Sequence, residues 1–179
     1  EPKDMYISRL ACVNGGLPVE TGALTVNRLC GSGMQAIVSA AQYILLGDTD
    51  AAVAGGAESM SRAVYMNLTQ RWGARMGDTK MVDAMVGALT DPFDTIHMGV
   101  TAENVAARCS ITREQQDAFA VESHARATRA LAAGHFKDQI LPIELKSKKG
   151  PVFFDTDEHV RSDATLDGMA KLRAVFIKE

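Results

Sequence analysis

The chain has 179 residues, of which 46% are hydrophobic and 23% charged, and its formal net charge at pH 7 is −3. This composition lies in the ordinary globular range and excludes a disordered tail, a collagen-like fibre or a coiled coil as the main architecture. The lack of a bulk positive charge argues against a nucleic-acid partner. No apolar run reaches the ~18 residues typical of a membrane span, so we expect no membrane partner.

Cysteine and histidine are too sparse for a disulfide scaffold or a structural metal site. Cys12, Cys30 and Cys109 form no C-x-x-C pair, and the four histidines form no H-E-x-x-H pattern. We therefore expect no metal, and a reducing, cytoplasmic compartment is the default. The chain opens at Glu1 without a methionine, which leads us to expect a piece of a longer protein.

The first third of the chain has the pattern of a parallel α/β unit. A segment with β-branched residues at 23–29 predicts a strand, and the run at 34–46 predicts a helix that Gly47 ends. A short buried strand is expected at 50–56, which completes a βαβ unit. The helix is apolar on nearly every face, so we expect it to be buried under cover that the first sixty residues cannot supply.

The remaining residues predict shorter elements and one long helix. Residues 62–98 are rich in methionine and favour irregular structure with short helices. Thr112 and Gln115 form a capping box that begins a helix, and Gly134 is placed to follow its end. Beyond it we expect strands at 140–145 and 151–155, joined by a polar turn, and a short helix at 165–172.

Cys30 is the sharpest chemical feature of the sequence. It stands between a predicted strand and a predicted helix and is followed by Gly31 and Gly33, which permit a tight turn and close approach of another molecule. The amides and dipole of a helix N-terminus stabilise a thiolate and a developing oxyanion. Cys30 is therefore a candidate nucleophile, and the alternative is an inert small hydrophobic residue. The turn matches neither the hydrolase elbow nor the P-loop.

Four segments resemble those of the thiolase family, in the order in which the family has them. Residues 26–36 (Val-Asn-Arg-Leu-Cys-Gly-Ser-Gly-Met-Gln-Ala) are similar to the nucleophile segment, and residues 55–61 (Gly-Gly-Ala-Glu-Ser-Met-Ser) to a second signature. Residues 71–77 and 97–104 look like the loop domain of bacterial acetyl-CoA acetyltransferases and β-ketothiolases. The resemblance runs over essentially the whole chain. It implies a thiolase-type layered α/β fold, seen in part, with an α+β loop domain.

This resemblance also implies domains, substrates and site residues. Residues 1–61 would belong to the N-terminal core domain and residues 62–179 to the loop domain that covers coenzyme A. Cys30 would attack an acyl-CoA to form an acyl-enzyme thioester, which a second acetyl-CoA or free CoA then resolves. Such enzymes need no cofactor, since the CoA thioesters are substrates, and they are usually tetramers. The residues that match the family's CoA-binding positions are Leu89, His97 and Met98 at the pantetheine tunnel and Arg161 near the adenine.

The sequence also departs from the family pattern. Gly168 stands where relatives often have serine, and no Asn-Glu-Ala-Phe, Gly-His-Pro or Cys-x-Gly segment occurs in the 179 residues. The family takes its catalytic histidine and its acid/base cysteine from the last two of these segments, so we expect this chain alone to be inactive. Two alternatives remain: a related condensing enzyme such as a ketoacyl synthase, and a non-catalytic acyl-CoA-binding or assembly module.

Overall fold

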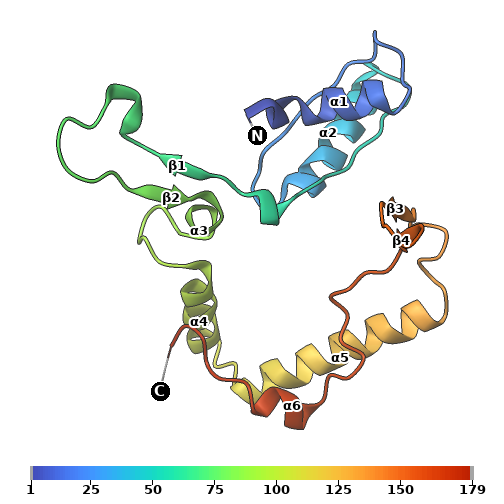
Figure 1. The fold of residues 1–179 in the computed structure, drawn as a ribbon. Coiled ribbons are helices and arrows are strands. Elements are labelled where there is room, and N and C mark those ends of the chain that lie inside the picture. The colour runs from blue at the N-terminus through green and yellow to red at the C-terminus, as the bar shows by residue number, and fades with distance from the viewer. Residues whose placement is uncertain (1, 178–179) are drawn as a thin grey trace. The chain divides into compact units, whose positions relative to one another are not determined.

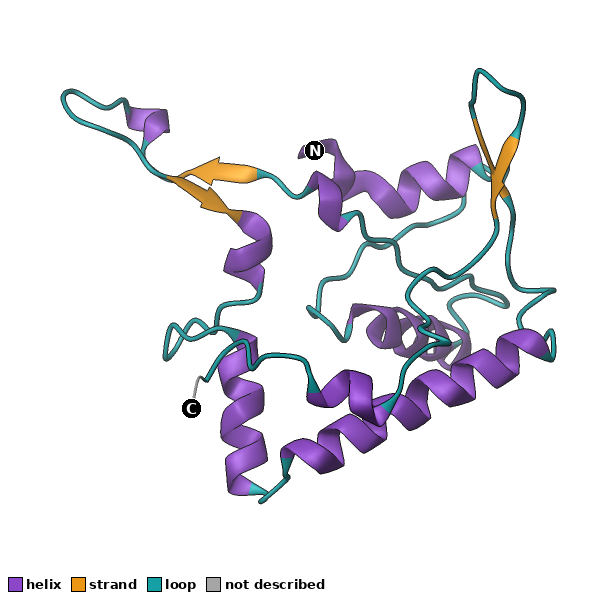
Figure 2. Ribbon diagram, turned by 60° about the horizontal axis from the view of Figure 1, so that its bottom comes forward, coloured by secondary structure: helices purple, strands orange, loops and turns teal. Residues whose placement is uncertain are grey.

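The computed structural model describes residues 2–177 (Figure 1). The chain divides into two compact units, with the boundary between Ala88 and Leu89. These units are defined by contacts within the chain. The boundary expected at residue 61 separates the two domains that the resemblance implies, and it stays a prediction. Helices and loops make up most of both units, and the strands form two short hairpins (Figure 2).

The first unit begins with a helical segment and contains one long helix. Arg9 on α1 donates a 2.7 Å hydrogen bond to the carbonyl oxygen of Thr21, and the hydroxyl groups of Ser8 and Thr25 lie 2.6 Å apart, so the loop after α1 returns along the helix. The elements in chain order are η1 (Pro2–Tyr6), α1 (Ile7–Asn14), α2 (Ser32–Leu46), η2 (Met60–Arg62), β1 (Tyr65–Asn67), η3 (Gln70–Trp72), β2 (Met81–Asp83) and α3 (Ala84–Ala88).

The long helix α2 confirms the prediction of a helix at 34–46 that Gly47 ends. Gly47 has a φ of 79°, in the left-handed region that glycine adopts without steric cost. Its amide donates to the carbonyl oxygen of Ile44, and the amide of Asp48 donates to that of Tyr43. These bonds satisfy carbonyl groups of the last turn, which is the usual role of a glycine after a helix.

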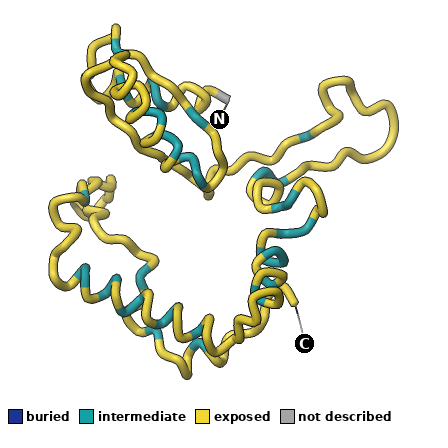
Figure 3. The backbone as a smooth tube through the Cα atoms, turned by 180° about the vertical axis from the view of Figure 1, so that it is seen from behind, coloured by how far each residue is buried: buried dark blue, intermediate teal, exposed yellow. Residues whose placement is uncertain are grey.

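The burial expected for α2 is not present in this chain. No residue among those whose burial the structure describes is buried, as Figure 3 shows, and Leu45 and Leu46 of α2 are 84% and 77% exposed. The sequence predicts that the cover for α2 comes from further chain or a partner, and that prediction stays untested. Burial requires a covering element as well as an apolar face, and the described residues leave Leu45 and Leu46 uncovered.

The expected parallel strands at 23–29 and 50–56 also do not form. Among the described residues, strands pair only as two antiparallel hairpins, β1 with β2 and β3 (Ile143–Leu145) with β4 (Val152–Phe154). Parallel strands form almost only in sheets whose two faces are covered by helices, and each strand also needs hydrogen-bond partners in neighbouring strands. Residues 23–29 and 50–56 have no such neighbours in the described chain, and their β propensity alone does not make a sheet.

One helix passes the length and composition test for a membrane span. The window Leu29–Leu46, which contains α2, has a mean hydropathy of 1.3. This corrects the expectation that no stretch of the chain is long and apolar enough to cross a membrane. A core helix of a soluble protein passes the same test, so a single such window is weak evidence for a membrane span, and the expectation of no membrane partner stays a prediction.

The second unit confirms most of the predicted local signals. Thr112 and Gln115 form both bonds of the capping box, and Gly134 follows the last turn of the long helix with a φ of 73°. Residues 143–145 pair with 152–154 in the expected hairpin. The helices of this unit are α4 (Met98–Arg108), α5 (Arg113–Ala132) and α6 (Leu166–Ala170).

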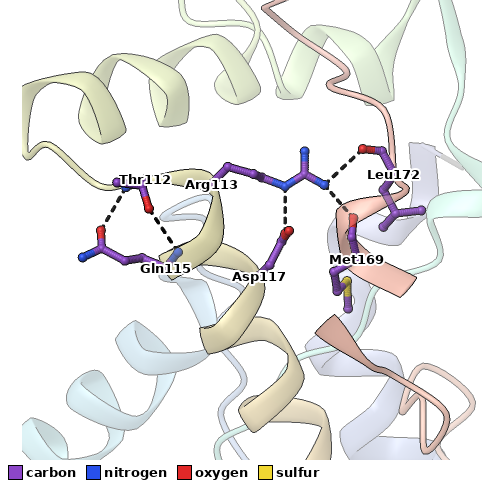
Figure 4. Close-up of polar contacts among 6 residues, drawn as sticks. All are labelled: Thr112, Arg113, Gln115, Asp117, Met169 and Leu172. Atoms are coloured by element: carbon purple, nitrogen blue, oxygen red, sulfur yellow. Dashed lines mark hydrogen bonds and ion pairs between the residues drawn. The ribbon is translucent and has the colours of Figure 1, made fainter. Parts of the chain in front are cut away.

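Arg113, in the first turn of α5, joins this helix to α6 (Figure 4). Its guanidinium Nε lies 2.8 Å from the Asp117 carboxylate, one turn along α5. One terminal nitrogen donates to the carbonyl oxygens of Met169 and Leu172, at 2.7 and 3.1 Å. These carbonyl groups lie at the C-terminal end of α6, where the last carbonyl oxygens of a helix lack amide donors within the helix. Arg113 on α5 supplies a hydrogen-bond donor to them.

This geometry predicts that Arg113→Gln loosens α6 from α5 in the full-length protein. Hydrogen bonds from a charged donor contribute about 1.5–3 kcal/mol, and exposure of the arginine reduces this to about 1 kcal/mol. Amide hydrogen exchange over residues 166–172 should therefore become roughly fivefold faster. Arg126→Gln is the matched control, because Arg126 pairs with Glu122 on the same helix. Equal exchange in α6 for both variants would contradict the assignment.

Candidate active site

Cys30 lies in a tight turn directly before α2, and its thiol is free and exposed. The Gly31 amide donates to the carbonyl oxygen of Arg28, and the Ser32 amide donates to that of Leu29, both at 3.0 Å. The Ser32 hydroxyl also donates to the Leu29 carbonyl oxygen, at 2.7 Å. The turn is thus closed by its own backbone and leaves the sulfur atom open to another molecule.

The residue before the cysteine adopts an uncommon backbone conformation. Leu29 has a φ of 49°, in the left-handed region that residues other than glycine rarely occupy. Its amide donates to Asn27 Oδ1 at 2.9 Å, and the Arg28 guanidinium donates to Gln35 Oε1 at 2.8 Å across the turn. Such conformations cost of order 1–3 kcal/mol and cluster at functional sites. Sequence reasoning missed this feature, because leucine carries no signal for positive φ.

Of the backbone amides at the start of α2, some close the turn and others have no acceptor among the described residues. Those of Gly31 and Ser32 close the turn, so they are not free to hold an oxyanion as the sequence suggested. The amides of Gly33 and Met34 donate to no acceptor among the described residues, as expected for the first turn of a helix. These two amides and the dipole of α2 form the electropositive end next to the thiol.

Leu89, His97 and Met98, in the second unit, are brought together by a closed loop. The Met98 amide donates to the carbonyl oxygen of Leu89 at 2.8 Å, and Thr90 pairs with His97 in an isolated antiparallel bridge. The side chains of Leu89 and Met98 are both 40% exposed, which leaves apolar surface available to a ligand. The structure therefore supports the expectation that these three residues lie at one place.

The imidazole of His97 caps α4 and keeps one orientation. Its Nδ1 accepts a 3.0 Å hydrogen bond from the Gly99 amide. Because that nitrogen is an acceptor, the ring proton of neutral His97 lies on Nε2, which becomes a hydrogen-bond donor. The ring also stacks on Phe176, with centroids 5.0 Å apart and planes inclined by 25°.

Arg161 lies beside α5, apart from this loop. Its backbone amide donates to His124 Nδ1 at 3.1 Å, and its guanidinium makes two bonds to the Asp163 carboxylate, at 3.2 and 3.4 Å. The pairing raises the pKa of Arg161, and the arginine lowers the pKa of the Asp163 carboxyl. Both side chains are exposed, so this ion pair adds little stability and leaves Arg161 accessible to an anionic ligand.

The predicted site residues are therefore distributed over both units. Cys30 belongs to the first unit, while the loop residues and Arg161 belong to the second. A hollow along α2, lined by residues such as Leu24 and Tyr43, contains none of the predicted site residues. Within the described part of the chain, no group of three or more histidine, cysteine or carboxylate side chains is placed to hold a metal ion.

Comparison with known proteins shows which family these residues belong to. The family model "Thiolase, N-terminal domain" matches residues 1–179. The chain is 67% identical over 179 residues to Beta-ketothiolase BktB of Cupriavidus necator, of which it covers 45%. It is 49% identical over 174 residues to an acetyl-CoA acetyltransferase of Chromobacterium violaceum, with 96% of this chain and 44% of that protein covered. The chain thus spans less than half the length of the curated relatives it matches.

Solved thiolase structures have the same fold over this region. Human mitochondrial 3-ketoacyl-CoA thiolase in complex with CoA matches with a TM-score of 0.91 and 40% identity, over 99% of this chain and 44% of that one. The acetyl-CoA acetyltransferase of Bacillus anthracis matches with a TM-score of 0.88 and 43% identity, over 95% and 43%. The expected thiolase-type α/β fold is confirmed, and the chain belongs to the thiolase family, whose N-terminal domain model matches its residues 1–179.

Proposed function

We propose that the full-length protein is an acyl-CoA thiolase of the acetyl-CoA C-acyltransferase type. Its reaction is the Claisen condensation of two acyl-CoA molecules or, in reverse, the thiolysis of a 3-ketoacyl-CoA. The observation that carries this proposal is the exposed Cys30 thiol at the start of α2, within the segment that resembles the thiolase nucleophile. Membership of the family and the names of the relatives, which include a β-ketothiolase, support the same reaction.

In the first half of the proposed reaction, Cys30 is the nucleophile. A base takes the thiol proton, and the sulfur attacks the thioester carbonyl carbon of an acyl-CoA. The bond between that carbon and the CoA sulfur then breaks, CoA leaves as a thiol after taking up a proton, and Cys30 carries the acyl group. The dipole of α2 and the amides of Gly33 and Met34, which donate to no acceptor among the described residues, make the helix start that follows Cys30 favourable for an anionic group.

In the second half, another acetyl-CoA loses an α-proton to a base and its carbanion attacks the acyl-enzyme. The new carbon–carbon bond forms as the Cys30–acyl bond breaks, so the thiolate is regenerated and a 3-ketoacyl-CoA leaves. This division into two half-reactions gives ping-pong kinetics. The histidine and cysteine that serve as bases in the family have no counterpart motifs in these 179 residues, so we assign both roles to further chain.

Leu89, His97, Met98 and Arg161 are the proposed contacts for coenzyme A. The loop places the apolar surface of Leu89 and Met98 beside the Nε2 donor of His97, which suits the pantetheine arm, since that arm alternates methylene groups with amides. The exposed guanidinium of Arg161 suits the phosphate-bearing adenosine end, because arginine binds phosphate in a bidentate manner. No cofactor is part of this scheme.

Assembly and location follow the family expectation in this proposal. We place the protein in the cytoplasm as a homotetramer, with no nucleic-acid or membrane partner. The apolar residues exposed along α2 and in the methionine-rich segment support burial against further chain or other subunits. A non-catalytic acyl-CoA-binding module is the alternative, and in that case Cys30 would not accept an acyl group.

The proposal predicts that acetyl-CoA acetylates Cys30 in the full-length protein. After incubation and acid quench, mass spectrometry of the peptide that contains residue 30 should show the acetyl group. Cys30→Ala should abolish the label and reduce kcat by about four orders of magnitude or more, as the loss of a catalytic nucleophile does. Cys109→Ala is the control, since Cys109 is also exposed and free. Acetylation elsewhere, with Cys30 unmodified, would refute the proposed mechanism.

A second prediction concerns the 179-residue chain by itself. It holds the proposed nucleophile without the family's acid/base segments, so we expect negligible turnover in the thiolysis of acetoacetyl-CoA. The measurement is the loss of acetoacetyl-CoA absorbance in the presence of free CoA, with the full-length protein as the positive control. Sustained turnover by the isolated chain would mean that these residues contain a complete set of catalytic groups.

A further inference from the structure

Phe176, which lies far from His97 in the sequence, packs on the start of α4. The two ring centroids are 5.0 Å apart with an interplanar angle of 25°, an offset-stacked arrangement. Phe176 is 43% exposed, so part of its surface stays open to solvent beside this contact. Both residues belong to the second unit, and the contact joins the end of the described chain to the loop that carries His97.

Gly99 is the residue that allows Phe176 to come so close. A Cβ atom built on Gly99 would overlap three carbon atoms of the Phe176 ring. The helical Gly87 on α3 provides a contrast, because the nearest atom to a Cβ there is a Val82 methyl carbon at 4.0 Å. Any side chain at position 99 therefore displaces Phe176, whereas a methyl group at position 87 is accommodated.

These contacts restrain the His97 ring from several sides. Its Nδ1 accepts from the Gly99 amide, its backbone pairs with Thr90, and one ring face lies on Phe176. A flip about χ2 would break the hydrogen bond from the Gly99 amide, and rotation about χ1 would break both that hydrogen bond and the stack on Phe176. The remaining polar atom, Nε2, carries the proton and is therefore held in a single direction as a donor.

We propose that Phe176 is a positioning residue for His97 and that Gly99 is required because it admits the Phe176 ring. The fixed Nε2–H then donates to a carbonyl oxygen of the bound acyl-CoA, on the pantetheine arm or at the thioester. This inference rests on the proposed function for the identity of the ligand, while the arrangement of the three residues is independent of it. A ligand that meets a preoriented donor binds without the cost of ordering that side chain.

The test compares four variants of the full-length protein. Gly99→Ala and Phe176→Leu should each raise KM for acyl-CoA by about tenfold while kcat stays within about threefold, because the lost interaction acts in binding. Phe176→Tyr keeps the stacked ring and should retain the KM of the parent. Gly87→Ala is the matched control for adding a methyl group to a helical glycine and should change neither constant.

A double-mutant cycle and a spectrum distinguish positioning of His97 from a general structural role. His97→Asn keeps an amide acceptor at the start of α4 but removes the ring, so Phe176→Leu should add no further increase in KM in that background. In histidine-labelled protein, the His97 ring protons should show a ring-current shift from Phe176. That shift should be absent in Gly99→Ala and Phe176→Leu and present in Gly87→Ala.

The proposal fails if the His97 ring-proton shifts are the same in the parent, Gly99→Ala and Phe176→Leu. It also fails if Phe176→Leu raises KM equally with and without the His97 ring. If the unaltered protein turns over no acyl-CoA, the proposed function is wrong, and the ring-current comparison still decides whether Gly99 and Phe176 orient His97.

Discussion

The hydrogen bonds that close the turn before α2 determine where the Cys30 sulfur lies. With the amides of Gly31 and Ser32 bound to the carbonyl oxygens of Arg28 and Leu29, the chain reverses within a few residues and the thiol is left exposed. The positive φ of Leu29 is the local cost of this reversal. A thiol held in this way at the end of a helix is suited to accept an acyl group, and the proposed half-reactions depend on that placement.

The proposed recognition of coenzyme A depends on a different local arrangement, the loop that carries Leu89, His97 and Met98. The loop from Leu89 to Met98 is closed by backbone hydrogen bonds from Met98 to Leu89 and from Asp91 to Ile96, and it ends with His97 capping α4. The backbone amide of Arg161 donates a hydrogen bond to His124 Nδ1 on α5. The Arg113 guanidinium on the same helix donates to the Met169 carbonyl oxygen of α6. Each of these contacts of Arg161 and Arg113 uses one or two hydrogen bonds rather than a hydrophobic core.

Local signals in the sequence predicted local structure well and long-range structure poorly. The capping box of Thr112 and Gln115 and the stop at Gly47 depend on neighbouring residues, so they could be identified directly. The strands expected at 23–29 and 50–56 require partners in a sheet, which these residues do not have in the described chain. The contact between Phe176 and Gly99 joins distant segments, and only the structure shows why glycine stands there.

The rate at which Cys30 is alkylated, compared with that of Cys109 in the full-length protein, shows whether Cys30 is an activated nucleophile. Both thiols are free and exposed, so access alone would make their rates similar. We expect a thiol-specific alkylating reagent to modify Cys30 at least about tenfold faster and acetyl-CoA to protect it, because a helix N-terminus stabilises anionic groups. Equal rates with no protection by acetyl-CoA would contradict this expectation.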